Sequence, residues 1–197
     1  MAKTCLLLLS IFILSVAITA NSASPRTSKA SKYVTSSCST VTYPQLCVQY
    51  LGDYSSKIQN NPHQMALTAL SVSVNEAQSA KTFVTKLGKF KNLKKREYEA
   101  IVDCLEEIQD AIERLQKSVK EMKDMNKYRG SDLLWHMSNV QTWVSAAETD
   151  ENTCLDGFSG KAMDGKIKSS IRARILKVTQ LTSNALALCN QFAAKKH

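Results

Sequence analysis

The sequence is poor in residues that break helices. Its 197 residues include three prolines and six glycines, whereas folds built from many short strands need frequent Gly- and Pro-rich turns. No stretch alternates apolar and polar residues as a half-buried strand does. These absences exclude an all-β fold and favour a chain of long helices.

Groups for catalysis or metal binding are also scarce. The three histidines, His63, His136 and His197, lie far apart, and no serine or cysteine stands in a recognisable nucleophile motif. No pair of possible metal ligands has the spacing of a zinc site. A row of carboxylates recurs at helical steps, which is typical of a solvated helix face: Asp103, Glu106, Glu107, Asp110 and Glu113. The sequence therefore predicts a binding protein that is not an enzyme and uses no metal or cofactor.

The N-terminus has the layout of a cleaved secretory signal. One lysine precedes an apolar run, and the small residues Ala20 and Ala23 follow it. A membrane span is the competing interpretation, but polar residues begin soon after Ala20, so we expect no membrane association after cleavage. We predict a signal peptide at 1–23, a loose segment at 24–31 and secretion into an oxidising extracellular compartment. No Asn-x-Ser/Thr acceptor occurs in the chain, so no N-glycan is expected.

The net charge of +9 restricts the partners of a secreted protein. An extracellular acidic polymer or an acidic protein is the expected partner, rather than nucleic acid. The basic stretch at 89–96 is interpreted as a solvated connection between helices.

Apolar residues recur at steps of three and four in four long segments, which predicts four amphipathic helices. Asn61-Pro62 is expected to start the first helix, Gly88 to end it, and Ser131-Asp132 to cap the third. The predicted buried positions are Leu67, Leu70, Val74, Ala77, Val84 and Leu87, then Tyr98, Ile101, Leu105, Ile108, Ile112, Leu115, Val119 and Met122, then Leu133, Met137, Val140, Val144 and Ala147, and finally Ile167, Ile171, Ile175, Val178, Leu181, Ala185 and Leu188.

Short links between these helices favour an all-α fold, an antiparallel up-down four-helix bundle over 61–193. An N-terminal helical hairpin is expected at 32–60, and a C-terminal tail at 194–197. A long coiled coil is the alternative, but glycines and cysteines interrupt any shared heptad.

Four framework cysteines in an oxidising compartment permit three connectivities. Cys38 and Cys47 are close enough to clamp the hairpin, Cys104 lies within the second bundle helix, and Cys154 is expected just after the third. The least strained pairing is Cys38–Cys47 with Cys104–Cys154. Cys189 then has no partner, and we interpret it as a buried, inert thiol.

Three segments resemble the plant invertase and pectin methylesterase inhibitor family. They are Cys38-Ser-Thr-Val-Thr-Tyr-Pro-Gln-Leu-Cys47, the run from Met137 to Phe158 with Thr-Cys-Leu-Asp-Gly-Phe at its end, and Leu181-Thr-Ser-Asn-Ala-Leu-Ala-Leu188. The resemblance covers about residues 30 to 193. It implies the bundle, the hairpin and the same two disulfides.

The resemblance implies inhibition of one of two enzymes. Invertase inhibitors often have a Pro-Lys-Phe motif where this chain has Asn126-Lys127-Tyr128, and the runs 141–147 and 181–188 are more similar to pectin methylesterase inhibitors. We therefore expect an inhibitor that is monomeric when free and covers the esterase's pectin-binding cleft in a one-to-one complex. Glu148 and Cys189 depart from the family's usual residues at their positions.

The resemblance also implies that the interface includes polar positions of the middle helices and Thr153, the threonine before the fourth framework cysteine. If Val140, Val144 and Ala147 face the core, the neighbouring positions turn outward or to the flank, and the candidate interface residues are Asn139, Thr142, Trp143, Ala146 and Thr153. Trp143 is either an interface anchor or a residue that packs on the hairpin or the bundle edge.

Two other functions remain open at this point. One is a structural wall protein that binds acidic pectin through basic faces containing Lys166, Lys168, Arg172, Arg174 and Lys177. The other is the pro-region of a larger esterase, for which the sequence offers no catalytic domain.

Overall fold

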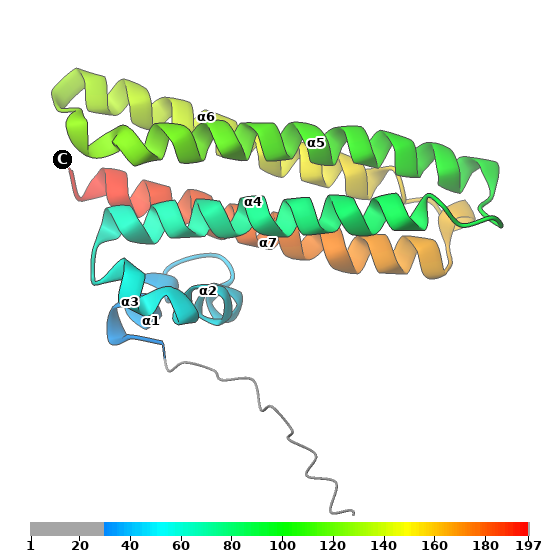
Figure 1. Cartoon of the computed structure of the whole chain (residues 1–197), viewed down its shortest axis with the longest axis horizontal. Helices are drawn as coiled ribbons and strands as arrows, with labels where there is room; N and C mark the ends of the chain where they lie inside the picture. The colour runs from blue at the N-terminus through cyan, green and yellow to red at the C-terminus, as the bar shows by residue number, and fades with distance from the viewer. Residues whose placement is uncertain (1–29, 197) are drawn as a thin grey trace, which may run out of the picture.

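The computed structural model describes residues 30–196, and no strand occurs among them. Four long helices run alternately up and down beside one another (Figure 1). They are α4 (Pro62–Leu87), α5 (Lys95–Asp124), α6 (Gly130–Asp156) and α7 (Lys166–Ala194). Short 3₁₀ turns, η2 (Met125–Lys127) and η3 (Lys161–Met163), lie in the connections. The predicted all-α up-down bundle is confirmed.

The apolar stripes meet in one core. Each long helix packs against two neighbours, in the order α4, α5, α6, α7 and back to α4. Ile108, Leu115, Val140, Ile175 and Leu188 are among the buried side chains. Burial of each such side chain contributes about 1.5–3 kcal/mol, so the core dominates the stability of the fold.

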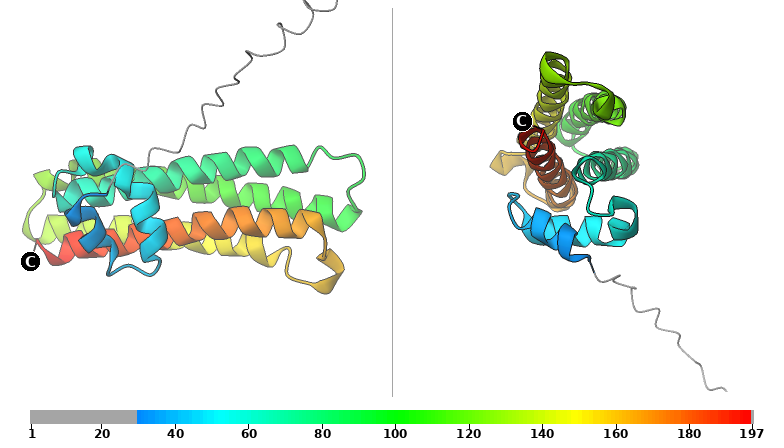
Figure 2. Two further views of the ribbon diagram at one scale, coloured as in Figure 1. Left: turned by 90° about the horizontal axis from the view of Figure 1, so that it is seen from below. Right: turned by 90° about the vertical axis from the view of Figure 1, so that its left-hand side faces the viewer.

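The N-terminal segment forms a small helical unit. It comprises α1 (Lys32–Cys38), α2 (Pro44–Leu51), η1 (Gly52–Tyr54) and α3 (Ser55–Ile58). This unit packs on α4 and α7 and leaves the opposite side of the bundle, formed by α5 and α6, uncovered (Figure 2). The buried side chain of Asn184 in α7 holds it in place: Oδ1 accepts from the backbone N–H of Tyr43 and Nδ2 donates to the Tyr43 carbonyl, both at 2.9 Å.

Both predicted disulfides are present. Cys38–Cys47 joins the end of α1 to α2, and Cys104–Cys154 joins α5 to α6. Loop-closure entropy assigns ~2.7 kcal/mol to the short loop and ~4 kcal/mol to the long one. The second bridge therefore stabilises the bundle itself, while the first orders the N-terminal unit. Cys189 is unpaired and fully buried in α7.

The start of α4 is as predicted. The side chain of Asn61 accepts hydrogen bonds from the backbone N–H groups of His63, at 2.9 Å, and Gln64, at 3.3 Å, and Pro62 is the first helical residue. Gly88 caps the other end. A Cβ at Gly88 would lie 3.2 Å from Cγ2 of Ile101, so this glycine also permits the close approach of α5.

Three local predictions are wrong. Tyr98 is 53 % exposed rather than buried, because it lies in the first turn of α5, where Glu97 turns inward and accepts from the Lys94 N–H at 2.8 Å. The third helix is capped by Arg129, and Ser131 and Asp132 lie inside its first turn, because Gly130 already begins the helix with φ +51°. Cys154 lies within α6, not after it.

The predicted signal peptide and residues 24–29 of the loose segment lie outside the described residues, as does His197. Within 30–196, no helix is both long and apolar enough to cross a membrane.

Candidate functional site

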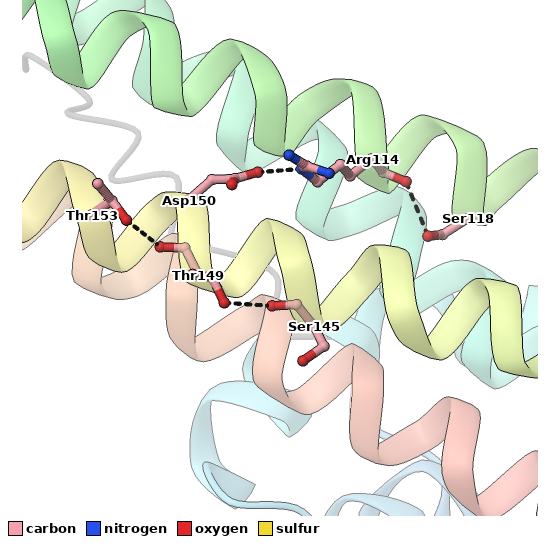
Figure 3. Close-up of polar contacts among 6 residues, drawn as sticks. All are labelled: Arg114, Ser118, Ser145, Thr149, Asp150 and Thr153. Atoms are coloured by element: carbon pink, nitrogen blue, oxygen red, sulfur yellow. Dashed lines mark hydrogen bonds and ion pairs between the residues drawn. The ribbon is translucent and has the colours of Figure 1, made fainter.

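The outer surface of α6 carries a line of short hydroxyl side chains. Its members recur every three or four residues and are all exposed: Ser138, Thr142, Ser145, Thr149 and Thr153. We call this line the hydroxyl stripe. Three of its residues follow one another along the helix in Figure 3. Thr149 Oγ1 donates to the Ser145 carbonyl at 3.1 Å, and Thr153 Oγ1 donates to the Thr149 carbonyl at 3.0 Å. These bonds fix the two side chains, so their methyl groups and oxygen lone pairs have set directions.

An ion pair connects the helix of the stripe to its neighbour. Arg114 Nε on α5 donates to Asp150 Oδ2 on α6 at 2.6 Å, directly beside Thr149 (Figure 3). The Asp150 side chain is 12 % exposed, and its partial burial raises the pKa of the carboxyl although the Arg114 guanidinium opposes this. The pair fixes the spacing of the two helices behind the surface.

Acidic side chains recur along α5, and three of them, Asp103, Glu106 and Glu107, lie across a groove from Thr153 at one end of the stripe. Asp103, Glu106, Asp110 and Glu113 are exposed, and Glu107 is half-buried. Burial, followed by the nearby charges of Asp150 and Asp110, raises the pKa of Glu107. A protein with net charge +9 thus has a locally acidic surface on α5.

A groove runs between α5 and α6 at the level of the Cys104–Cys154 disulfide. Asp103, Glu106 and Glu107 line one wall, and Thr153 and Asp156 line the other, around a volume of about 430 Å³. We call the hydroxyl stripe together with this groove the α5–α6 face. It has hydrogen-bonding oxygens and negative charge, which are groups suited to contacting a polar or basic protein surface.

The predicted interface residues divide into two sets. Thr142 and Thr153 are exposed members of the stripe. Asn139, Trp143 and Ala146 are half-buried at its flank, and Asn139 Nδ2 donates to Glu121 Oε1 at 3.4 Å. The structure therefore places all five on or beside one surface, but only two of them face solvent.

Trp135 is 62 % exposed on this helix and was not among the predicted interface residues. It lies one turn before Ser138, on the line of the stripe. The Trp135 indole lies edge-on to the His136 ring, with 4.8 Å between the ring centroids. The Tyr128 ring stacks on the same His136 ring, with 3.5 Å between centroids. His136 Nδ1 also lies 2.5 Å from Glu121 Oε1. Trp135 lies three residues before Ser138, on the side of α6 away from the buried residues Leu133 and Met137. This spacing is the sequence signal that could have identified Trp135 as part of the outer surface.

The inward side of α6 contains a buried carboxyl. Glu151 is 1 % exposed, and Thr182 on α7 donates to its Oε1 at 2.8 Å. Burial raises the pKa of Glu151 to about 8. This group has no access to solvent or to a partner, so it belongs to the core behind the face.

The unpaired thiol of Cys189 lies in the core and not on this surface. No cluster of three His, Cys, Asp or Glu side chains within the described part of the chain could hold a metal ion. Burial raises the pKa of the Cys189 thiol to about 12, which makes it a poor nucleophile.

One family of known proteins matches nearly the whole described chain. The family model described as "Plant invertase/pectin methylesterase inhibitor" matches residues 32–188. A "21 kDa protein" from Daucus carota is 53 % identical over 92 % of this chain and 93 % of its own length. "Pectinesterase inhibitor 11" from Arabidopsis thaliana is 51 % identical over 99 % of this chain and 100 % of its own length.

A solved structure has the same fold. The crystal structure of a mutant form of a pectin methylesterase inhibitor from Arabidopsis aligns with a TM-score of 0.64. The alignment covers 81 % of this chain and 97 % of that one at 19 % sequence identity, so it supports the bundle architecture alone.

Proposed function

Since this chain belongs to the plant invertase/pectin methylesterase inhibitor family, we propose that it is a secreted protein inhibitor of plant pectin methylesterase. The proposal rests on the alignment with "Pectinesterase inhibitor 11", which is 51 % identical over 99 % of this chain and 100 % of that one. The extracellular space of the cell wall is where such an inhibitor and the esterase would meet.

The inhibition is steric. The α5–α6 face lies across the pectin-binding cleft of the esterase in a one-to-one complex and prevents the polysaccharide from entering. From Trp135 to Thr153, the far end of the stripe, α6 rises about 27 Å, at about 1.5 Å per residue. A surface of that length fits an interface of about 800 Å² on each partner, which is the size of stable enzyme–inhibitor contacts.

Different residues have different roles in this complex. Thr142 and Thr153 contact the esterase directly through fixed hydroxyl and methyl groups, while Asn139, Trp143 and Ala146 support the stripe from its flank. Trp135 is an anchor at the far end, because an exposed indole held by its neighbours buries a large area at low entropic cost. The chain acts as a monomer.

Inhibition of acid invertase is less well supported. The residues at the position of the invertase-type motif are Asn126, Lys127 and Tyr128, in and after η2. Tyr128 is half-buried against His136, and the motif's proline is absent. The same scaffold nevertheless makes invertase the natural comparison in any assay.

The test is a pair of assays with the mature chain, residues 24–197. Added to plant pectin methylesterases at mildly acidic pH, it should block the release of methanol from pectin, and the same amount should leave sucrose hydrolysis by acid invertase unchanged. Full esterase activity across a panel of plant isoforms would refute the proposal. Loss of invertase activity alone would assign the chain to the other branch of the family.

A further inference from the structure

The bundle brings two basic segments together at one end. The connection between α4 and α5 and the connection from α6 into α7 both lie at the end of the bundle opposite the C-terminus (Figures 1 and 2). We call the exposed cations of these segments, and of the one or two helical turns that adjoin them, the basic pole; they are Lys86, Lys89, Lys91, Lys94, Lys95, Arg96, Lys161, Lys166 and Arg172.

Cross-helix contacts give the register of this pole. Arg174 on α7 donates to Ser79 Oγ on α4. Lys86 lies about 10 Å beyond Ser79 along α4, and Lys166 lies about 12 Å beyond Arg174 along α7, in the same direction because the helices are antiparallel. These two lysines are therefore level with each other, although 80 positions separate them in the sequence.

Few acidic groups neutralise the pole. The one ion pair found for its members among residues 30–196 joins Lys95 to Glu99 at 3.7 Å, with the lysine side chain 90 % exposed. Glu97 is buried and caps α5, and Asp164 pairs with Lys168 at 2.8 Å. Asp156, the last residue of α6, lines the groove between α5 and α6. The pole is strongly positive.

Three of the five cations that the sequence suggested for pectin contact other side chains in the structure. Lys177 pairs with Glu76 at 3.0 Å and lies over the Tyr50 ring, Lys168 pairs with Asp164, and Arg174 is half-buried against Ser79. Of the five cations that the sequence suggested for pectin, Lys166 and Arg172 stay exposed and unpaired within the described residues. Lys161 and the exposed cations in and beside the α4–α5 connection make up the rest of the basic pole.

An aromatic ring stands among these charges. Phe90 is 57 % exposed between Lys89 and Lys91. A ring of this kind can cover the apolar face of a sugar while adjacent ammonium groups pair with its carboxylates. Each exposed ion pair contributes only about 0–1 kcal/mol, so a ligand needs many regularly spaced charges to bind here.

We propose that the basic pole binds a polyuronide, the anionic polysaccharide that hydrolysis of pectin methyl esters leaves behind. The choice of a polyuronide rests on the proposed function, because the esterase converts neutral ester groups to carboxylates; the positive charge of the pole does not depend on it. Binding keeps the inhibitor on regions of the wall that the esterase has already demethylated.

The test compares two variants of the mature chain from which equal charge is removed. The pole variant has Lys89→Gln, Lys91→Gln, Lys166→Gln and Arg172→Gln. The control variant has Lys57→Gln, Lys117→Gln, Lys120→Gln and Lys123→Gln, all exposed and outside the pole. Binding to polygalacturonate and to highly methyl-esterified pectin is measured at 50 mM and 200 mM salt.

The wild type should bind polygalacturonate at least tenfold more tightly than methyl-esterified pectin, and more weakly at the higher salt because screening grows. The pole variant should lose at least tenfold in affinity and the control variant less than twofold. Phe90→Ala should weaken binding without changing its salt dependence. Heparin is a further polyanion for comparison. Equal losses of polygalacturonate affinity in the two charge variants would overturn the inference. So would unchanged binding by Phe90→Ala together with equally tight binding of heparin, because both results indicate non-specific attraction to polyanions.

Direct binding to purified esterase, measured without pectin, separates this inference from the proposed function. The pole variant should bind the esterase as the wild type does. Polygalacturonate binding without esterase binding would contradict the proposed function alone. Esterase binding without polygalacturonate binding would contradict the polyuronide site alone.

Discussion

Replacing Glu151 with Gln should remove a large pH dependence of stability. The folded state holds this carboxyl in its protonated form, because burial raises its pKa from 4.5 to about 8 and Thr182 on α7 contacts only one of its oxygens. The neighbouring carboxyls Glu148 and Asp150 add repulsion when Glu151 ionises. The unfolded chain loses the same proton near pH 4.5, so the folded state binds more protons between these values.

The sign and size of the effect follow from that difference. The contribution of Glu151 to stability is greatest below pH 4.5 and falls as the pH rises toward 8, because folding must then bind a proton or bury a charge. At about 1.4 kcal/mol per pH unit, the loss between pH 5 and pH 8 is roughly 3 to 4 kcal/mol. For a denaturation slope of about 2 kcal/mol/M, the urea midpoint should fall by about 2 M.

The assay is urea unfolding followed by circular dichroism at pH 5, 6.5 and 8. Glu151→Gln keeps an acceptor for Thr182 and cannot ionise, so its midpoint should change by less than about 0.5 M over this range. Glu113→Gln, an exposed carboxyl on α5, is the matched control and should behave as the wild type does. A wild-type urea midpoint that stays constant from pH 5 to pH 8 would refute the reasoning. An equal change of the midpoint with pH in the wild type and in Glu151→Gln would also refute it.

Three further predictions concern the interface and the framework. Thr153→Ala and Trp143→Ala should each weaken esterase inhibition at unchanged helical content by circular dichroism; if inhibition and helicity fall together, that residue is structural. Trp135→Ala should weaken inhibition by at least tenfold with an unchanged melting temperature, and full inhibition would remove it from the interface. Replacing Cys104 and Cys154 together by Ala should cost ~4 kcal/mol in urea unfolding, against ~2.7 kcal/mol for the N-terminal bridge, and equal costs would contradict the assigned roles.

The architecture was predictable because it depends on local patterns. Apolar steps of three and four gave the four helices, and Asn61-Pro62 gave the start of α4. The disulfides followed from the order of these helices and the positions of the cysteines. The prediction failed at the ends of elements: Ser131 does not cap α6 because a glycine with positive φ begins the helix one residue earlier.

The surfaces were harder to predict because they depend on what covers each helix. Tyr98 continues the apolar period of α5 but lies in its first turn, where it remains exposed. Trp135 was not predicted, although its position three residues before Ser138 places it away from buried Leu133 and Met137. The basic pole combines residues near 90 with residues near 166, and no window of the sequence contains both.

The most direct test of the account is a titration of pectin methylesterase with two matched threonine variants. Thr153 on α6 and Thr82 on α4 are both exposed and both donate to the carbonyl four residues earlier at 3.0 Å, but only Thr153 lies on the α5–α6 face. The wild type and Thr82→Arg should abolish methanol release at one equivalent, while Thr153→Arg should leave the esterase active. Equal inhibition by the two variants would contradict occlusion of the esterase by the α5–α6 face.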